Sequence, residues 1–372
     1  NNIVANFNSD CICFIMDITP IILNLCGDKK SSDVREVSSE TTFKIFEILP
    51  NEIVPVYITS CILDKKAGGL ANLARPATKI TALKLLSNAA TKAPREIEGM
   101  MTILVPVVSH AMWDVKKSVK EQAEETLEDI CGSIDNIDIK PFIPNLVDAI
   151  ADPDTVPDCI YSLAGTTFVQ TVTASALSIT VPLLKRGFND KKTAIRRKCA
   201  VITENMAKLV KNPADVEPFM PVLHPLLLQG IEQISDPECR ARFTAAEEVL
   251  SRVGNKGKIV ARKVMSIDDV SQIVGQIVNT DPNVSKFISQ ICMSLTNISK
   301  NFIKSTWKNS FASIKILQEE DIDKLRNSCA EFVGDESTNG TSKEYIDEDP
   351  DAEDLCNLEF SLAYGSKILL NN

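Results

Sequence analysis

Apolar and polar positions recur in a fixed frame between the N-terminus and Gly254. The segments ILVPVVSHAMWD, PFIPNLVDAIAD and SITVPLLKRGFND each carry an apolar pair, a proline, further apolar residues, and an aspartate eight positions after the proline. The prolines are Pro106, Pro144 and Pro182, and each is 38 residues from the next. The aspartates, with the same spacing, are Asp114, Asp152 and Asp190. Looser copies start at Pro20, Pro55 and Pro221. Self-similarity at this period predicts an array of repeated structural units.

Each repeat is predicted to be a pair of helices. After the aspartate, apolar residues step by four and three positions, which is the spacing of one buried helical face. The clearest stripes are Ile195, Cys199, Ile202, Met206 and Leu209, and Val119, Ala123, Leu127, Ile130 and Ile134. The proline falls in the first helix, and the aspartate is positioned to cap the second. Cations six residues after the aspartate, at Lys120, Arg196 and Arg242, are expected to pair with aspartates of adjoining repeats.

A helical hairpin of about 40 residues, repeated in this way, resembles the HEAT repeat. The resemblance implies an all-α fold, an α-solenoid over residues 1–254, in which each hairpin covers the apolar face of its neighbour. We expect no strand in this span. Such arrays bind proteins, nucleic acids and membranes alike, so the architecture leaves the function open.

Beyond Gly254 the frame stops, and residues 255–333 are predicted to form a small helical bundle. The expected helical stretches are 266–279, 283–298, 300–316 and 319–333. Ser266 followed by Asp269 is typical of a capping box at the start of the first of them.

Two segments of different character complete the chain. Residues 334–354 are rich in Gly, Ser and acidic residues, as flexible linkers are. In residues 355–372, apolar and polar residues alternate from Leu358 to Tyr364, and a second apolar run follows Gly365. This pattern predicts a short β-hairpin. Because a lone hairpin is marginal in water, we expect it to open a truncated domain.

The net charge of −10 is unevenly distributed. Gln318 to Glu359 holds 15 acidic and 3 basic residues, which leaves about +2 for the rest of the chain. Thr180 to Lys211 holds nine Lys and Arg residues against two acidic ones. The charge pattern therefore predicts a mildly basic body joined to an acidic connector.

Composition excludes several kinds of chemistry. With only two histidines, His110 and His224, the chain has little with which to build a zinc or Ser-His centre, and both are expected to be structural or surface residues. Eleven cysteines without a CxxC pair indicate reduced thiols and a cytoplasmic protein. The most apolar N-terminal stretch is interrupted by Asp17 and Pro20, so no membrane span and no signal peptide is predicted.

Several segments resemble a known family. The run EDLCNLEFSLAYGSKILLN is similar to the opening strands of the first ATP-binding cassette of fungal-type translation elongation factor 3. MWDVKKSVK, IADPDTVPDCIYSLAGTTFV, VTASALSITVPLLKRGFNDKKTAIRRKCAVITENMAKLV and ISDPECR resemble its HEAT region. The likeness runs in order from about residue 50 to residue 372 and is weaker over 283–350.

The resemblance implies a ribosome-binding region of a translation factor. Intact family members use ATP and Mg²⁺ in two cassettes to promote exit-site tRNA release and aminoacyl-tRNA delivery. The implied partners are rRNA, ribosomal proteins and other elongation factors. This chain departs from the family in having no G-x-x-x-x-G-K-[ST] motif and no cassette signature. We therefore expect no ATPase site, and neither ATP nor Mg²⁺ bound, in the chain itself.

Candidate binding residues follow from charge and from the resemblance. The basic cluster consists of Lys185, Arg186, Lys191, Lys192, Arg196, Arg197 and Lys198, and it is either a contact surface for rRNA phosphates and acidic ribosomal segments or a solvated rim of the array. Lys116 and Lys117 form a weaker patch beside Trp113. We expect Trp113 to be a core residue rather than a platform on which nucleic-acid bases stack. The resemblance assigns Tyr364 to adenine stacking in an intact cassette; otherwise it is an ordinary strand tyrosine.

Three functions remain open from the sequence. The first is the HEAT region just described. The second is a stand-alone scaffold for other proteins, and the third is a ribosome sensor of the amino-acid starvation response, which resembles the same HEAT segment. The run from Leu355 to Leu370 favours the elongation factor, because the sensor lacks a cassette opening.

Overall fold

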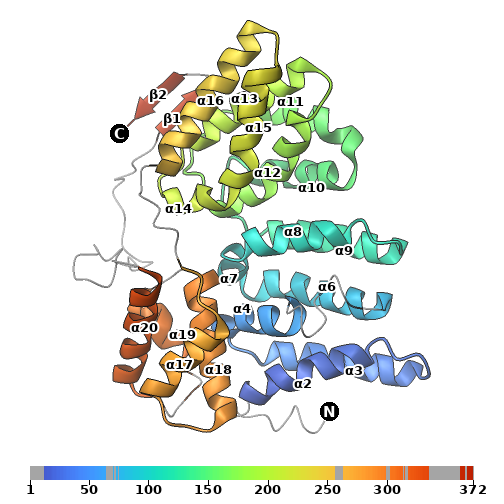
Figure 1. Cartoon of the computed structure of the whole chain (residues 1–372). Coiled ribbons are helices and arrows are strands. Elements are labelled where there is room, and N and C mark those ends of the chain that lie inside the picture. The colour runs from blue at the N-terminus through green and yellow to red at the C-terminus, as the bar shows by residue number, and fades with distance from the viewer. Residues whose placement is uncertain are drawn as a thin grey trace, which may run out of the picture. The chain divides into compact units, whose positions relative to one another are not determined.

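The computed structural model describes residues 12–63, 70, 73, 75–255, 263–298, 302–312, 314, 317–334, 361–364 and 367–371. In this part of the chain every regular element up to residue 334 is helical, as predicted (Figure 1). The chain divides into two compact units. Unit 1 comprises Asn1–Met100, Pro106–Ser133 and Ala261–Lys343, and unit 2 comprises Met101–Val105, Ile134–Val260 and Glu344–Asn372.

Unit 1 begins with helical hairpins. Its first elements are α2 (Ile12–Leu25), α3 (Ser32–Glu47), a 3-10 turn (Asn51–Ile53), α4 (Val54–Tyr57), a π-helical segment (Ile58–Leu63), α6 (Pro76–Lys92), α7 (Pro94–Glu98) and α9 (Lys117–Cys131). α8 (Met101–Ala111) is divided between the units, with Met101–Val105 assigned to unit 2 and the residues from Pro106 onward to unit 1. The predicted stripe is fully buried within α9, from Val119 to Ile130, so the spacing of four and three identified the inward face of this helix correctly. Ile134, the last residue of the predicted stripe, is buried beyond the end of the helix.

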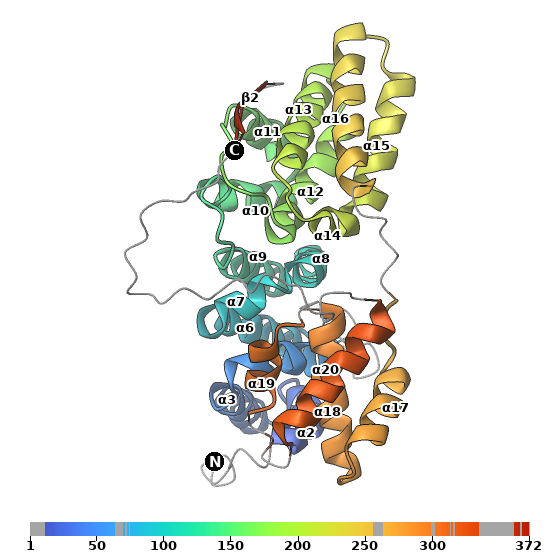
Figure 2. The ribbon, with the colours of Figure 1, turned by 90° about the vertical axis from the view of Figure 1, so that its left-hand side faces the viewer.

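The C-terminal helices of unit 1 pack against its N-terminal ones. They are α17 (Ile267–Ile277), α18 (Pro282–Met293) with a π-helical extension (Ser294–Ile298), α19 (Lys304–Ser310) and α20 (Glu319–Val333). α18 contacts α2, and α19 contacts the 3-10 turn at Asn51–Ile53 (Figure 2). An ion pair between Lys286 and Asp17 joins α18 to α2. Segments about 270 residues apart in sequence are therefore part of one core.

The predicted capping box at the start of α17 is present. The Ser266 hydroxyl accepts a hydrogen bond from the Asp269 backbone N–H at 3.1 Å, and the Asp269 carboxylate accepts one from the Ser266 backbone N–H at 2.9 Å. Farther along, Trp307 of α19 is fully buried and stacks on Phe302 at 5.9 Å between ring centroids. These apolar contacts account for the formation of α19 from a sequence with a weak helical pattern.

Unit 2 consists of three stacked helical hairpins. Its helices are α10 (Ile143–Ala151), α11 (Val156–Ala164), α12 (Ala174–Phe188), α13 (Thr193–Lys208), α14 (Pro213–Val216), α15 (Met220–Gln233) and α16 (Pro237–Asn255). α13 packs between α11 and α16, and α12 packs between α10 and α15. The predicted stripe of α13 faces the core, since Ile195, Cys199 and Ile202 are fully buried.

The aspartate of each repeat caps the turn between its two helices. Its carboxylate accepts a hydrogen bond from the backbone N–H two residues later, at 2.7 to 3.3 Å, and so closes the turn. The residues concerned are Asp28, Asp114, Asp152, Asp190 and Asp236. The expected cap of the second helix is made only in part: Asp236 caps the start of α16, whereas the N-cap residues of α9 and α13 are Lys116 and Lys192, which make no side-chain cap.

An ion pair between neighbouring hairpins is found at Lys79 and Asp114, whose Nζ and Oδ2 atoms lie 2.6 Å apart. Lys79 is not one of the cations predicted to pair with the repeat aspartates, which were Lys120, Arg196 and Arg242.

The predicted β-hairpin is present near the C-terminus. β1 (Ser361–Tyr364) pairs antiparallel with β2 (Lys367–Asn371), with Leu362 opposite Leu370 and Tyr364 opposite Lys367. Most of the expected linker, residues 335–354, lies outside the described residues. The nine cysteines in the described part of the chain are all buried.

Candidate functional site

The basic cluster brackets the turn between α12 and α13. α12 ends at Phe188, Asp190 caps the turn, and α13 begins at Thr193. The apolar residues of α13 face the core, and the lysines at the turn are exposed to solvent. Lys185, Lys191 and Lys192 are exposed, and none of their ammonium groups has a partner among the described residues.

Three other cations of the cluster hold neighbouring hairpins together. The Arg186 guanidinium donates to the Ala149 carbonyl of α10, and burial lowers the pKa of Arg186. Arg197 forms an ion pair with Glu238 of α16 at 2.8 Å between Nη1 and Oε1. The Lys198 ammonium lies 4.6 Å from the centroid of the Tyr161 ring of α11, within the range of a cation–π contact. Arg197 and Lys198 are therefore partly exposed and engaged with neighbouring helices.

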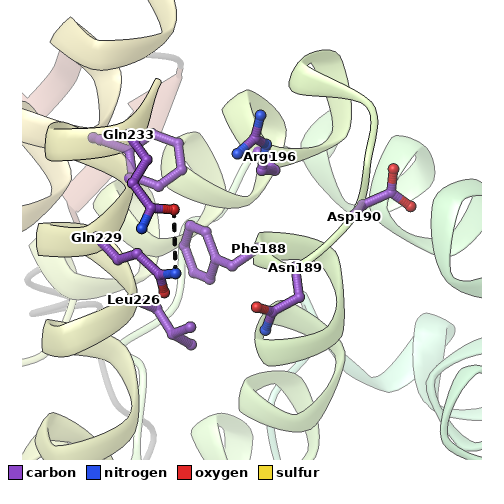
Figure 3. A pocket seen from close by; sticks show the side chains of 9 residues that line it. Phe188, Asn189, Asp190, Arg196, Leu226, Gln229 and Gln233 are labelled. Carbon is purple, nitrogen blue, oxygen red and sulfur yellow. Dashed lines mark hydrogen bonds between the residues drawn. The ribbon is translucent and has the colours of Figure 1, made fainter. Parts of the chain in front are cut away.

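Arg196 lines a cavity between two neighbouring hairpins of unit 2. The cavity has a volume of about 180 Å³, and α12, α13, α15 and α16 all contribute to its wall. The polar and aromatic wall residues include Phe188, Asn189, Asp190, Arg196, Gln229 and Gln233 (Figure 3). The Arg196 Nε atom is buried and has no hydrogen-bond partner. The predicted pairing of Arg196 with a repeat aspartate is therefore not made within the described residues.

Unit 1 carries the second predicted patch at the turn before α9. Lys116 and Lys117 are exposed, and Lys117 pairs loosely with Glu121 at 3.4 Å. The expectation that Trp113 is a core residue is wrong, because 53% of its surface is exposed. Val115, 94% exposed, stands at the same turn. Asp114 closes a tight turn here. Trp113 and Val115 lie on this turn and are exposed.

The remaining candidates have structural surroundings or lie outside the described side chains. His110 is exposed in α8, and His224 bonds Glu247 of α16 at 3.1 Å, which agrees with surface and structural roles. Tyr364 is the last residue of β1, and its side chain is outside the described residues. Within those residues, no group of three or more His, Cys, Asp or Glu side chains could hold a metal ion.

The sequence did not identify the residues that contact the cations of the basic cluster. Tyr161, Glu238 and the two glutamines of the cavity lie in the neighbouring repeats, about 40 residues before or after the cluster. A signal was present in the repeat period itself. Adding or subtracting 38 residues from the position of each cation indicates which neighbouring helix turn it faces.

The helices were also compared with the length and hydropathy that a membrane span requires. No single described helix meets both. The bent pair Ser32–Glu47 and Asn51–Leu63 meets them only when its two arms, 117° apart, are taken together.

The stacked hairpins, with their capped turns and buried stripes, define an α-solenoid of the HEAT class. Comparison with protein families agrees and is more specific. Residues 4–127 match the family model described as EF3 N-terminal HEAT repeat. Residues 154–261 match the one described as Elongation factor 3/GNC1 HEAT repeat.

Curated relatives resemble almost the whole chain. Elongation factor 3 of Phytophthora infestans is 36% identical over 371 residues, which are 96% of this chain and 35% of the relative. Elongation factor 3 of Pneumocystis carinii is 36% identical, with 96% and 34% covered. Elongation factor 3A of Saccharomyces cerevisiae is 35% identical, with 96% and 35% covered. The chain belongs to the elongation factor 3 family, as an elongation factor 3-type HEAT region, and spans about a third of the length of these relatives.

Proposed function

We propose that the chain is the ribosome-binding HEAT region of a cytoplasmic elongation factor 3-type protein. The name of the relatives supports a role in translation elongation. In the proposal, the whole protein hydrolyses ATP to release exit-site tRNA and to assist aminoacyl-tRNA delivery. The HEAT region contributes contacts to rRNA and ribosomal proteins, and it holds neither ATP nor Mg²⁺.

The observation that carries this proposal is that the basic cluster contains two kinds of cation, those that contact neighbouring hairpins and those that are exposed to solvent. Arg186, Arg197 and Lys198 are engaged with neighbouring hairpins. Lys185, Lys191 and Lys192 are exposed and without a described partner, so three mobile positive charges lie at one turn. Lysine ammonium groups of this kind neutralise phosphates and release counterions, which gives a salt-dependent affinity for RNA.

Co-sedimentation with ribosomes tests the proposal. Replacing Lys185, Lys191 and Lys192 together by Glu should weaken binding about tenfold or more and flatten its dependence on salt. The matched control reverses Lys29, Lys30 and Lys140, which are also exposed lysines at or near inter-helix turns. Equal binding of parent and cluster variant at both low and moderate salt would contradict the assignment, and equal losses in the two variants would indicate a non-specific charge effect.

The C-terminal hairpin supports a second part of the proposal. Its two antiparallel strands coincide with the segment whose sequence resembles a cassette opening. We therefore place residues 355–372 at the start of an ATP-binding cassette, with Tyr364 stacking on adenine in the intact domain. Reading the coding sequence beyond Asn372 tests this: a G-x-x-x-x-G-K-[ST] motif within about 30 residues supports it. Its absence would favour the stand-alone scaffold or the starvation sensor.

A further inference from the structure

The cavity beside the basic turn has a hydrogen-bond donor in its wall that lacks an acceptor. Arg196 lines the cavity, and its Nε–H is buried with no acceptor among the described residues, although the side chain as a whole is half-buried. Buried polar groups in native proteins are normally hydrogen-bonded. A buried guanidinium donor without an acceptor, beside a polar cavity, therefore points to a ligand that brings acceptors of its own.

The one carboxylate in the wall is committed elsewhere. Asp190 Oδ1 accepts the Lys192 backbone N–H at 2.7 Å and so closes the turn before α13. Figure 3 shows the Asp190 carboxylate directed away from Arg196 and from the two glutamines. The Asp190 carboxylate therefore does not supply the acceptor that the Arg196 Nε–H lacks.

The opposite wall adds hydrogen-bond donors. Gln229 donates through Nε2 to Gln233 Oε1 at 3.2 Å, and both side chains are on exposed positions of α15. Because each amide nitrogen carries two N–H groups, this single bond leaves donors on both residues. The guanidinium of α13 and the amides of α15 therefore face the same volume from two neighbouring repeats (Figure 3).

We propose that this cavity binds a phosphate group of an RNA backbone, with Arg196 as its anchor. The proposal rests on the proposed function and names the ligand group for one site. A phosphate offers oxygen acceptors in several directions, which suits a fork-shaped guanidinium on one side and amides on the other. Lys185, Lys191 and Lys192 flank the same turn and neutralise neighbouring phosphates of the strand. This concentration of cations favours RNA over an isolated acidic side chain of a protein.

The Arg196 Nε–H group itself reports binding. In the intact chain, its nitrogen–proton NMR signal, assigned by its loss in Arg196→Lys, should shift when a short single-stranded RNA is titrated. Inorganic phosphate should shift it more weakly, and hexaglutamate should leave it in place. No shift with RNA overturns the proposal, and a shift with hexaglutamate alone replaces RNA by an acidic protein segment.

A charge-preserving variant separates this site from the lysine surface. Arg196→Lys keeps the charge but loses the fork, so ribosome binding should weaken fivefold to tenfold (about 1–1.4 kcal/mol) with an unchanged salt slope. Arg252→Lys, at an exposed position of α16, is the matched control, and thermal melts verify folding. Parent-like binding by Arg196→Lys, together with a loss in the lysine variant, overturns the cavity proposal alone. Parent-like binding by both overturns the proposed function as well.

Discussion

Gly230 in α15 lies directly against the ring of Phe243 in α16. A Cβ atom at this position would come within 2.0 Å of the ring. Phe243 is itself fixed by an edge-on contact with Phe188 of the preceding hairpin, at 5.4 Å between centroids. The absence of a side chain at Gly230 therefore sets how closely three helices approach one another.

We predict that Gly230→Ala lowers the free energy of unfolding by about 1–3 kcal/mol, because the methyl group must displace a buried aromatic ring. Thermal unfolding of the intact chain measures this. Gly275→Ala is the control: nothing lies within 4 Å of its added Cβ atom in α17, so removing a helical glycine there should stabilise by about 0.5–1 kcal/mol. Equal melting temperatures for Gly230→Ala and the parent would contradict the packing argument.

The roles of single cations were only partly predictable from sequence. The buried stripe of α13 separates inward from outward positions, and this part of the prediction is confirmed for Ile195 and Cys199. Whether an outward cation stays free depends on the residue that the next repeat places opposite it. Tyr161 and Glu238 engage Lys198 and Arg197, and no rule within one repeat could reveal these partners.

At the scale of elements, the inter-helix turn is the most regular feature of the array. An aspartate accepts the backbone N–H two residues later in five repeats. Such a carboxylate closes the turn that leads into the second helix. The sequence predicted the position of this turn because the turn needs only local geometry, but the predicted helix cap itself is made at Asp236 and not at Asp114 or Asp190.

The Asp114 turn predicts a specific dependence of stability on pH. The Lys79 ammonium and the Lys116 backbone N–H hold the pKa of Asp114 below its usual value. The folded state thus favours the ionised carboxylate, so the stabilisation is complete above about pH 4 and is lost as the pH falls through the folded-state pKa. Asp114→Asn retains a capping oxygen but not the charge, and should cost about 1 kcal/mol at neutral pH.

Denaturant titrations at neutral and acidic pH measure this difference. The gap between parent and Asp114→Asn should shrink toward zero as Asp114 becomes protonated. Glu40→Gln is the control, because its pair with Lys44 is exposed to solvent and contributes little. A gap that stays constant from neutral to acidic pH would show that the lost energy is not electrostatic.

At the scale of the whole molecule, the helices themselves were predictable from the sequence. Which helices pack together in one compact unit was not. The four helical stretches expected in residues 255–333 correspond to α17, α18, α19 and α20. The sequence predicted a bundle of their own, whereas the structure includes them in unit 1 together with α2 and its neighbours. Contacts between segments so far apart leave no periodic signal, and the apolar face of α18 gives no indication of the surface it covers.

Truncation tests this grouping. A chain ending at Asn255 should lose hydrogen-exchange protection in α2 and in the 3-10 turn Asn51–Ile53, since α18 and α19 cover them. α12, α13 and α16 of unit 2 should keep theirs, which makes them the internal control. Unchanged protection of α2 would instead support an independent bundle, as the sequence predicted.

The contact of α18 with α2 also bears on how the chain folds during synthesis. Lys286 is 269 residues downstream of its partner Asp17. At synthesis rates of 5–20 residues per second, α2 emerges from the ribosome roughly 13–54 s before α18 is available to cover it. During that interval its apolar surface has no native partner on α18, a situation in which nascent chains depend on chaperones. The packing of α2 is therefore completed only after α18 has been synthesised.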